Sequence, residues 1–413
     1  MKRLVYAFTV SSLFLLSGCW DKAELEEQAY VVVMGLDQHE EDENAVKVTF
    51  QIANPQVGSS ARGDEADEPP SDIVTLVASD VAIAKEQVHA IVTRKISFRH
   101  LATLIVSEKL ARSDQHHQLI ASLIIDPEVR RAMSFIVSKE EAKDFIHANK
   151  PRLETRPHKY FQFMRERWRE IGYVPDSNLN RYFQRLGGEL FLAAYATAEK
   201  NNAQQPRKGY LAGELPQEGG DPVQIIGSAV FRYGKMIGTL NGRETRTALF
   251  LREQSFVRNA METFTDPLNE KFEISARIIE AYDPDIKLNL KKNPIEIDVT
   301  IPVRLQMVSD LSLTDYSTNL KNQTRLKKSI QKQLEKRTME MIKKTQEEYQ
   351  SEPFLWYLNA RRHFRTLKEY EAFNWSEKYK NAKVSVQYEV EIANFGEQTK
   401  PAKLRKPKGG HES

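Results

Sequence analysis

The chain has 413 residues, of which 28% are charged and 40% hydrophobic, and it contains a single cysteine. Its 60 basic and 57 acidic residues give a formal net charge of +3, which does not indicate nucleic acid or a strongly acidic substrate as a partner. One cysteine excludes an intramolecular disulfide, so packed cores must stabilise the protein. The length is sufficient for two or three domains.

The N-terminus has the pattern of a lipoprotein signal peptide. A positive start at residues 1–3 precedes about 13 mostly apolar residues, a length typical of a signal-peptide core and too short to span a bilayer. Leu16-Ser17-Gly18-Cys19 then resembles a bacterial lipobox. We therefore expect residues 1–18 to be removed after Gly18, and Cys19 to become an N-palmitoyl, S-diacylglycerol cysteine.

Lipidation explains the lone thiol better than the alternative, a plain secretory signal followed by an incidental cysteine. That alternative would leave a free thiol on an exported protein. Two acyl chains hold a protein at a membrane surface, whereas one chain binds only marginally. The sequence thus predicts that the mature chain begins at Cys19 and is lipid-anchored on the extracytoplasmic face of a membrane.

Residues 19–200 show strand and helix patterns in alternation, which predicts an N-terminal α/β region of one or two domains. The expected strands cover residues 30–36, 45–52, 102–106 and 128–135. One expected helix begins at a cap at Ser79 or Asp80. A second expected helix covers residues 139–146. Residues 54–72 are rich in Gly, Ser, Pro and acidic side chains and predict a mobile acidic loop. The pattern over residues 151–195 does not distinguish helix from strand.

Residues 201–223 carry Gln, Pro, Gly and Asn with few apolar side chains, which predicts a linker between two domains. Residues 224–395 are expected to form a C-terminal α+β domain. Its expected strands cover residues 224–231, 235–240, 272–282, 295–308 and 382–392, and its expected helices cover residues 319–349 and 354–370. Residues 396–413 predict a basic flexible tail, with contact to anionic lipid as the alternative.

The helix expected over residues 319–349 has a narrow apolar stripe within a charged surface, so we expect it to pack along a sheet. Its interspersed lysines and glutamates favour a solvated outer face over a membrane-surface helix. The predicted fold class is therefore α+β: a multi-domain chain with mixed β-sheets flanked by helices, and a long amphipathic helix packed on a sheet in the C-terminal domain.

The nine histidines do not have the spacing of a metal site. His116 and His117 are adjacent, no HExxH motif is present, and thiol ligands are absent from the mature chain apart from Cys19. His100 opens a predicted strand and is interpreted as structural. The sequence has no Gly-x-Ser-x-Gly elbow and no phosphate-binding glycine loop. We therefore predict no catalytic residue, no cofactor and no metal.

Other polar and aromatic groups have ordinary structural interpretations. Arg130 and Arg131 beside Glu128 suit an anion, but charges at a strand edge more often prevent edge-to-edge association. Two aspartates on either side of Pro284 are typical of a turn. Core packing is favoured over a sugar-binding platform for an aromatic group comprising Phe354, Trp356, Tyr357, Phe364, Tyr370, Phe373 and Trp375.

Several short motifs occur in a fixed order along the chain. In the first half they are Cys19-Trp20-Asp21, Glu24-Leu25, Val33-Met34-Gly35-Leu36-Asp37, Phe98-Arg99-His100-Leu101, Ile105-Val106-Ser107-Glu108 and Asp126-Pro127-Glu128-Val129-Arg130-Arg131. In the second half they are Gly227-Ser228-Ala229-Val230-Phe231, Lys235-Met236-Ile237-Gly238 and Glu244-Thr245-Arg246. Together with the lipobox, they resemble the Ger(x)C family, the lipoprotein C subunits of nutrient germinant receptors in spore-forming bacteria.

The resemblance implies a non-enzymatic subunit on the outer surface of the spore inner membrane. It implies assembly with an A subunit and a permease-like B subunit, the latter contacting the nutrient. Binding of nucleic acid, or direct binding of a small molecule by this chain, is not expected. The chain departs from the family pattern in its enlarged acidic loop and its basic tail.

Two other classes of function remain to be compared. A solute-binding lipoprotein of a transporter needs two lobes around a cleft, which the linker permits, yet no convergent polar pocket is evident in the sequence. A cell-wall hydrolase needs a positioned acid or nucleophile, and the sequence offers none.

Overall fold

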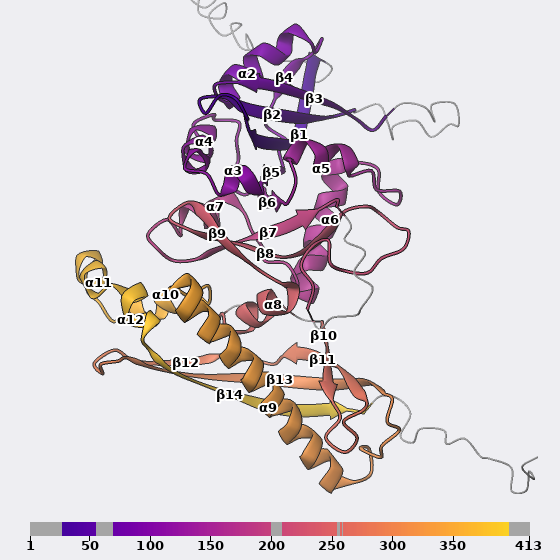
Figure 1. The fold of residues 1–413 in the computed structure, drawn as a ribbon, viewed down its shortest axis with the longest axis vertical. Helices are drawn as coiled ribbons and strands as arrows, with labels where there is room; N and C mark the ends of the chain where they lie inside the picture. Colours follow the sequence, from indigo (N-terminus) through magenta and orange to yellow (C-terminus); the bar gives the residue numbers. More distant parts are fainter. Residues whose placement is uncertain (1–26, 55–68, 200–208, 254–256, 258, 396–413) are drawn as a thin grey trace, which may run out of the picture.

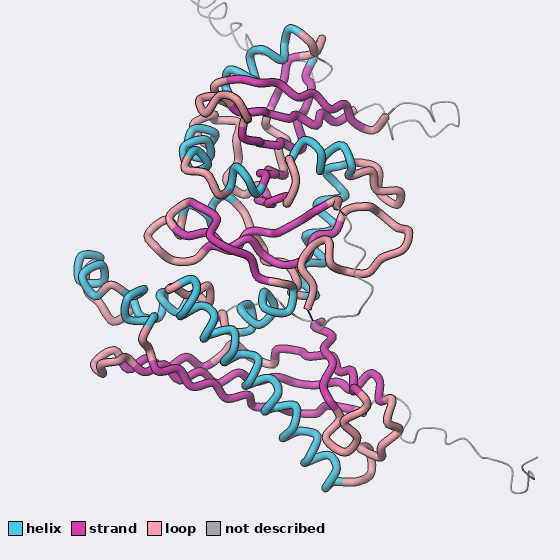
Figure 2. Tube along the Cα trace, in the orientation of Figure 1, coloured by secondary structure: helices cyan, strands magenta, loops and turns pink. Residues whose placement is uncertain are grey.

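The computed structural model describes residues 27–54, 69–199, 209–253, 257 and 259–395. Two β-sheet units follow one another along the long axis of the molecule (Figure 1). Within the described residues, the first unit has a nine-stranded sheet and the second a five-stranded sheet crossed by one long helix. Helices and strands are mixed throughout both units (Figure 2). The predicted α+β class with mixed sheets is confirmed.

The first sheet has the order β3-β2-β1-β5-β6-β7-β8-β9, and the short β4 pairs with the start of β1. Strands β1, β5, β6 and β7 are parallel and the outer strands antiparallel. The strands are β1 (Gln28–Gln38), β2 (Val46–Ala53), β3 (Ser71–Ala78), β4 (Lys95–Ser97), β5 (Thr103–Ser107), β6 (Ser134–Ser138), β7 (Phe191–Thr197), β8 (Gln224–Arg232) and β9 (Lys235–Leu240). The centre of β1 is continuously apolar because central parallel strands are covered on both faces.

Helices cover both faces of this sheet and form two separate cores. Helices α2, α3, α4 and α7 contribute to one core, and α5 and α6 contribute to the other. The helices are α2 (Val81–Gln87), η2 (Val88–Ala90), α3 (Glu108–Ala111), α4 (Gln115–Leu123), α5 (Ala142–Ala148), α6 (Pro157–Ile171), α7 (Leu179–Phe183) and α8 (Gly242–Phe250). The Asp80 side chain accepts a hydrogen bond from the Ile83 N–H at 2.9 Å, which confirms the predicted cap of α2.

The motif that contains Gly35 and Asp37 attaches helix α5 to strand β1. A Cβ atom on Gly35 would lie 2.8 Å from Ile146 Cδ1, so a larger residue at this position would displace the Ile146 side chain. The buried Asp37 carboxylate accepts hydrogen bonds from the N–H groups of Ala142, at 2.6 Å, and Lys143, at 3.0 Å. Burial raises the pKa of Asp37, and these two backbone hydrogen bonds oppose the rise.

The strand predicted over residues 128–135 is wrong, because β6 begins only at Ser134. The Asp126 carboxylate accepts the Glu128 N–H at 2.8 Å, and the Asp126 carbonyl accepts the Val129 N–H at 3.0 Å. These bonds form a turn after Pro127, so the backbone there is unavailable for strand pairing. In the region that the sequence left unassigned, the structure has α6, α7 and β7.

The linker predicted over residues 201–223 does not separate the two sheets. Strands β7 and β8, on either side of it, pair antiparallel within the first sheet. The Gln224 side chain accepts the Gly213 N–H at 2.9 Å and donates to the Leu215 carbonyl at 2.8 Å, which fixes the described part of this segment. The change of sheet lies instead between β9 and β10, because polar composition alone does not reveal which strands pair across a loop.

The second sheet has the order β10-β11-β13-β12, and β14 pairs in parallel with β13. Its strands are β10 (Ala260–Thr265), β11 (Glu273–Glu280), β12 (Asp285–Asn289), β13 (Glu296–Asp310) and β14 (Lys383–Asn394). Alternate residues of β13 are buried, including Ile297, Val299 and Ile301, and this period-two pattern places one strand face in the core. The predicted strands at 272–282, 295–308 and 382–392 are thus confirmed.

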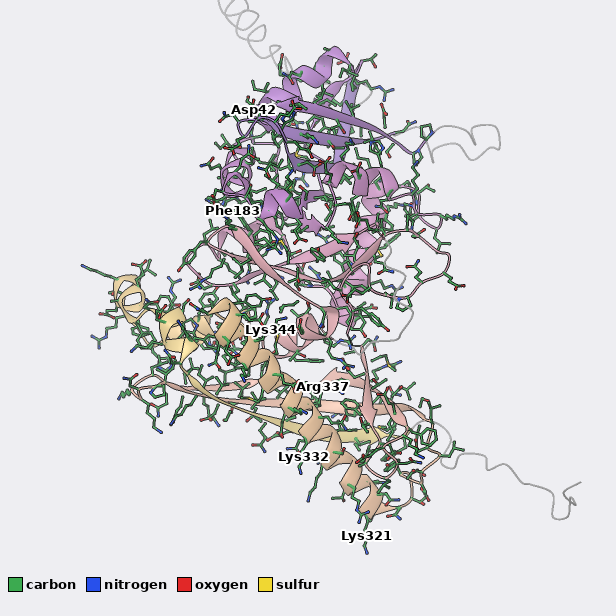
Figure 3. The ribbon with its side chains drawn as sticks, in the orientation of Figure 1. Asp42, Phe183, Lys321, Lys332, Arg337 and Lys344 are labelled. Carbon is green, nitrogen blue, oxygen red and sulfur yellow. The ribbon has the colours of Figure 1, made fainter. Side chains whose placement is uncertain are left out.

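Helix α9 (Leu320–Lys344) crosses the second sheet and continues into the π-helical turn η3 (Thr345–Tyr349). Its buried stripe includes Leu326, Ile330 and Leu334, which pack in the same core as the sheet. The lysines Lys321 and Lys332 lie on the exposed side (Figure 3). The predicted long helix on a sheet is confirmed, and its apolar face is already covered, which favours the solvated-face interpretation.

The single helix predicted over residues 354–370 is wrong. The structure has three short helices, α10 (Trp356–Arg361), α11 (Leu367–Phe373) and α12 (Trp375–Lys380). Thr366 begins α11 with a capping box that involves Glu369, and Asn374 ends it in the left-handed conformation. The predicted role in core packing is confirmed for five residues of the aromatic group, which are buried: Phe354, Trp356, Tyr357, Tyr370 and Trp375.

Candidate functional site

Cys19, the one site residue predicted from the sequence, lies outside the described residues, and its lipidation remains a prediction. The described chain starts one residue before β1. Within the described residues, no helix combines the length and the apolar character that crossing a bilayer requires. Most of the acidic loop and the whole basic tail also lie outside the described part of the chain.

A cavity lies in the first unit, at the amino ends of the parallel strands β5 and β6. Its volume is about 630 Å³, and helix α6 and the start of β1 form its walls. We call it the basic pocket, because its lining includes the cationic or titratable side chains of Arg99, His100, Arg130, Arg156, His158 and Arg165. No carboxylate is present among the described residues that line it.

The segments before β5 and β6 meet through the carboxylate of Glu128. It accepts the Phe98 N–H at 2.8 Å and the Lys85 ammonium at 3.0 Å, and it lies 3.5 Å from Arg99 Nε. Burial alone would raise the pKa of Glu128, but the hydrogen bonds from Phe98 and Lys85 outweigh it and hold the pKa below its usual value. Glu128 therefore stays ionised and fixes one side of the basic pocket.

The cations of the basic pocket differ in how they are paired. Arg156 makes a bidentate ion pair with Glu154, at 2.7 and 2.9 Å. Arg165 lies 3.5 Å from Ser134 Oγ, and Arg130 has no ion pair within the described chain. Burial, and then the charge of Arg156, lowers the pKa of His158. The pocket has the charge to bind an anionic group, whereas no nucleophile among its described lining residues is paired with a base.

The histidines singled out in the sequence have structural surroundings. His100 packs edge-on against Tyr30, with ring centroids 4.5 Å apart, at the rim of the basic pocket. His116 is buried, and its Nδ1 lies 2.7 Å from the Gly234 carbonyl oxygen. Burial lowers the pKa of His116 to about 4 despite that hydrogen bond, so the ring is neutral at physiological pH. Among the described residues, no three His, Cys, Asp or Glu side chains are grouped for a metal ion.

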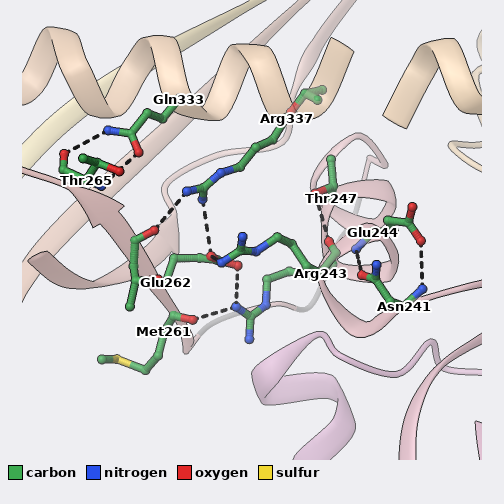
Figure 4. Close-up of polar contacts among 12 residues, drawn as sticks. Asn241, Arg243, Glu244, Thr247, Met261, Glu262, Thr265, Gln333 and Arg337 are labelled. Atoms are coloured by element: carbon green, nitrogen blue, oxygen red, sulfur yellow. Dashed lines mark hydrogen bonds and ion pairs between the residues drawn. The ribbon is translucent and has the colours of Figure 1, made fainter. Parts of the chain in front are cut away.

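A second polar cluster joins the two sheet units (Figure 4). Glu262 on β10 forms ion pairs with Arg246 at 2.9 Å and Arg243 at 3.0 Å, both on α8, and with Arg337 of α9 at 3.4 Å. Arg246 also donates to the carbonyls of Ile171, at 2.8 Å, and Met261, at 2.7 Å. We call this cluster the Glu262 junction.

Glu244-Thr245-Arg246 is one of the ordered motifs of the chain, and its sequence alone does not indicate what Arg246 contacts. The structure shows that Arg246 is 2% exposed and that its guanidinium carbon lies 3.9 Å from the centroid of the Tyr173 ring. Arg246 lies four residues from both Gly242 and Phe250, which are buried on α8, and this helical spacing could have indicated that its side chain points inward. Its partner Glu262 gave no comparable signal. Asp285, which the sequence placed in a turn, is the first residue of β12.

The chain matches two family models that divide it near the predicted linker. Residues 21–197 match the model described as spore germination protein N-terminal domain, and residues 226–396 match spore germination B3/GerAC like, C-terminal. The first sheet nevertheless continues across this division, since β8 and β9 pair with β7 and each other.

Three relatives from Bacillus subtilis (strain 168) are similar to this chain. Putative spore germination protein YfkR is 22% identical over 96% of this chain and 98% of its own length. Spore germination protein B3 is 20% identical over 93% of this chain and 96% of its own length. Spore germination protein KC is 29% identical over a shorter alignment, which covers 35% of this chain and 36% of that protein.

The crystal structure of the GerBC protein has a similar fold, with a TM-score of 0.53 and 16% identity, over 91% of this chain and all of that chain. These comparisons place the chain among spore germination proteins. It belongs to the Ger(x)C family, as its ordered motifs predicted. This family is not a known family of enzymes.

Proposed function

We propose that this protein is the lipid-anchored C subunit of a nutrient germinant receptor, positioned on the outer surface of the spore inner membrane. The match of both halves of the chain to germination-protein domains carries the proposal. The lipobox at residues 16–19 supports the anchor. The subunit has no catalytic role, and it contributes folded surface to receptor assembly or signalling together with the A and permease-like B subunits.

The partners are tested by copurification. The protein is tagged at its C-terminus, spore inner membranes are solubilised in mild detergent, and copurifying proteins are identified by mass spectrometry. We expect two polytopic membrane proteins, one of them permease-like. Recovery of an ATP-driven transporter instead, or of no membrane protein, would contradict the proposal.

The anchor is tested by substituting Cys19 with alanine. We expect the Cys19→Ala protein to leave the membrane fraction and to support slower germination. The physical reason is that a tether raises the effective concentration of the subunit at its partners without adding a contact. Membrane fractionation and germination rates are measured in spores that lack other receptors. A Trp20→Ala variant, with the cysteine intact, serves as the control. Full membrane retention and full germination of Cys19→Ala would refute the role of the anchor.

A solute-binding lipoprotein remains the second candidate, and the basic pocket is the observation in its favour. A cavity of about 630 Å³ with several cationic groups is large enough for a small anionic solute. Calorimetry with the purified mature chain separates the two functions. A C subunit is expected to release no binding heat with nutrients in the absence of its membrane partners, whereas a solute-binding protein would bind its ligand alone.

A further inference from the structure

A small cavity lined by four arginines lies where the two sheet units meet. Its volume is about 160 Å³. Arg169 of α6, Arg181 of α7 and Arg185 line it from the first unit, Arg252 lines it from the segment that connects α8 to β10, and Leu355 contributes from the second unit. The cavity shares no residue with the basic pocket.

The two acidic residues that line this cavity already have partners. Asp176 lies 2.8 Å from Arg169 and 3.3 Å from Arg181. Glu253 accepts a hydrogen bond from the side chain of Asn359 at 2.9 Å and lies 3.6 Å from Arg362. Neither acid forms an ion pair with the remaining two arginines, so the cavity contains more positive than negative charge.

Of the four arginines that line the cavity, Arg185 and Arg252 have no carboxylate ion-pair partner in the described chain. They are 8% and 9% exposed. Arg252 Nε donates to the Pro353 carbonyl at 2.8 Å, and Arg185 donates one hydrogen bond to the Arg181 carbonyl at 3.0 Å. Arg185 Nε is buried without a hydrogen-bond partner. Burial of an unpaired guanidinium is costly, so such a pair of side chains requires a compensating anion.

The protein itself supplies this compensation only at longer range. Glu352 is buried nearby, but its oxygens accept hydrogen bonds from the N–H groups of Phe354 and Tyr357, and no ion pair joins it to either arginine. Burial, followed by repulsion from Arg185 and Arg181, lowers the pKa of Arg252 to about 9. Both observations describe a positively charged cavity that an anion would complete.

We propose that this arginine cavity binds a compact oxyanion, either inorganic phosphate or the phosphate group of a small ester. The cavity volume of about 160 Å³ is sufficient for a phosphate group, which has five heavy atoms. Guanidinium groups donate paired hydrogen bonds that match phosphate oxygens. Because Arg185 belongs to the first unit and Arg252 to the connecting segment, the bound anion would link the two. The inference is independent of the proposed receptor role.

The test measures binding of inorganic phosphate to the complete mature chain by calorimetry and by thermal unfolding, with sodium chloride of equal ionic strength as the reference. The wild type should bind one phosphate and unfold at a higher temperature in its presence. Arg185→Met should lower the phosphate affinity at least tenfold. In phosphate-free buffer the same variant should be as stable as the wild type or more stable, because it removes a buried unpaired charge.

Arg304→Met, at an exposed position on β13, is the control and should keep wild-type affinity. If Arg185→Met does not fold, Arg185→Lys keeps the charge without the paired donors and should still weaken phosphate binding. A parallel titration with glycerol 1-phosphate distinguishes an ester from the free anion. Absence of binding by both probes, or unchanged affinity in the Arg185 variants, would overturn the proposal.

Discussion

Substituting Glu262 with glutamine is expected to destabilise the protein by about 3–5 kcal/mol, the range for removing one partner of a buried ion pair. Glu262 is 7% exposed, and it is the acid that three arginines share at the Glu262 junction. Glutamine keeps the size of the side chain but removes its charge. Arg246, which is 2% exposed, would then remain buried as an uncompensated cation.

Urea unfolding of the purified mature chain measures this effect. Glu391→Gln is the matched control, because its pair with Arg304 at 3.3 Å is exposed and should contribute no more than about 1 kcal/mol. The double variant Glu262→Gln, Arg246→Met removes both charges and should recover part of the lost stability. If Glu262→Gln and Glu391→Gln have similar effects, the junction does not stabilise the contact between the sheet units.

Substituting Glu352 with glutamine is expected to destabilise the protein by about 1–3 kcal/mol, because a buried N–H donor is left unsatisfied when an amide nitrogen replaces one of the accepting oxygens. Its carboxylate accepts the Tyr357 N–H at 2.8 Å, the Phe354 N–H, and the Trp375 indole N–H at 3.3 Å. These three donors come from the aromatic segment that forms α10 and α12. An amide side chain would present N–H groups to at least one of those donors.

Glu352 also predicts a specific pH dependence. Burial raises its pKa from 4.5 to about 7, against the backbone hydrogen bonds that oppose the rise. The folded protein therefore takes up a proton between about pH 4.5 and pH 7, so this group's contribution to stability decreases as the pH rises through that window. Unfolding free energies of the wild type and Glu352→Gln should thus differ more at pH 5 than at pH 7. An equal difference at both values would contradict the raised pKa.

The elements that could be predicted from sequence are those in which buried and exposed residues alternate with a single period along the whole element. Alternation along β13 and β14 and the apolar stripe of α9 follow directly from which face is buried. The N-cap at Asp80 could also be predicted from nearby residues, because an N-cap depends only on residues within one helical turn. Ordered motifs also identified the family. Lipidation of Cys19 is a further sequence-based prediction that the described residues do not test.

The contacts between segments far apart in the chain became evident only in the three-dimensional structure. Glu128 lies in a turn rather than in the predicted strand, and its carboxylate joins two motifs about 30 residues apart to shape the basic pocket. The pairing of β7 with β8 across a polar segment, and the ion pairs of Glu262 with arginines from two helices, are likewise long-range. The sequence position of a charged residue does not identify its ion-pair partner. The partner depends on how distant elements pack and on the cost of burying an unpaired charge.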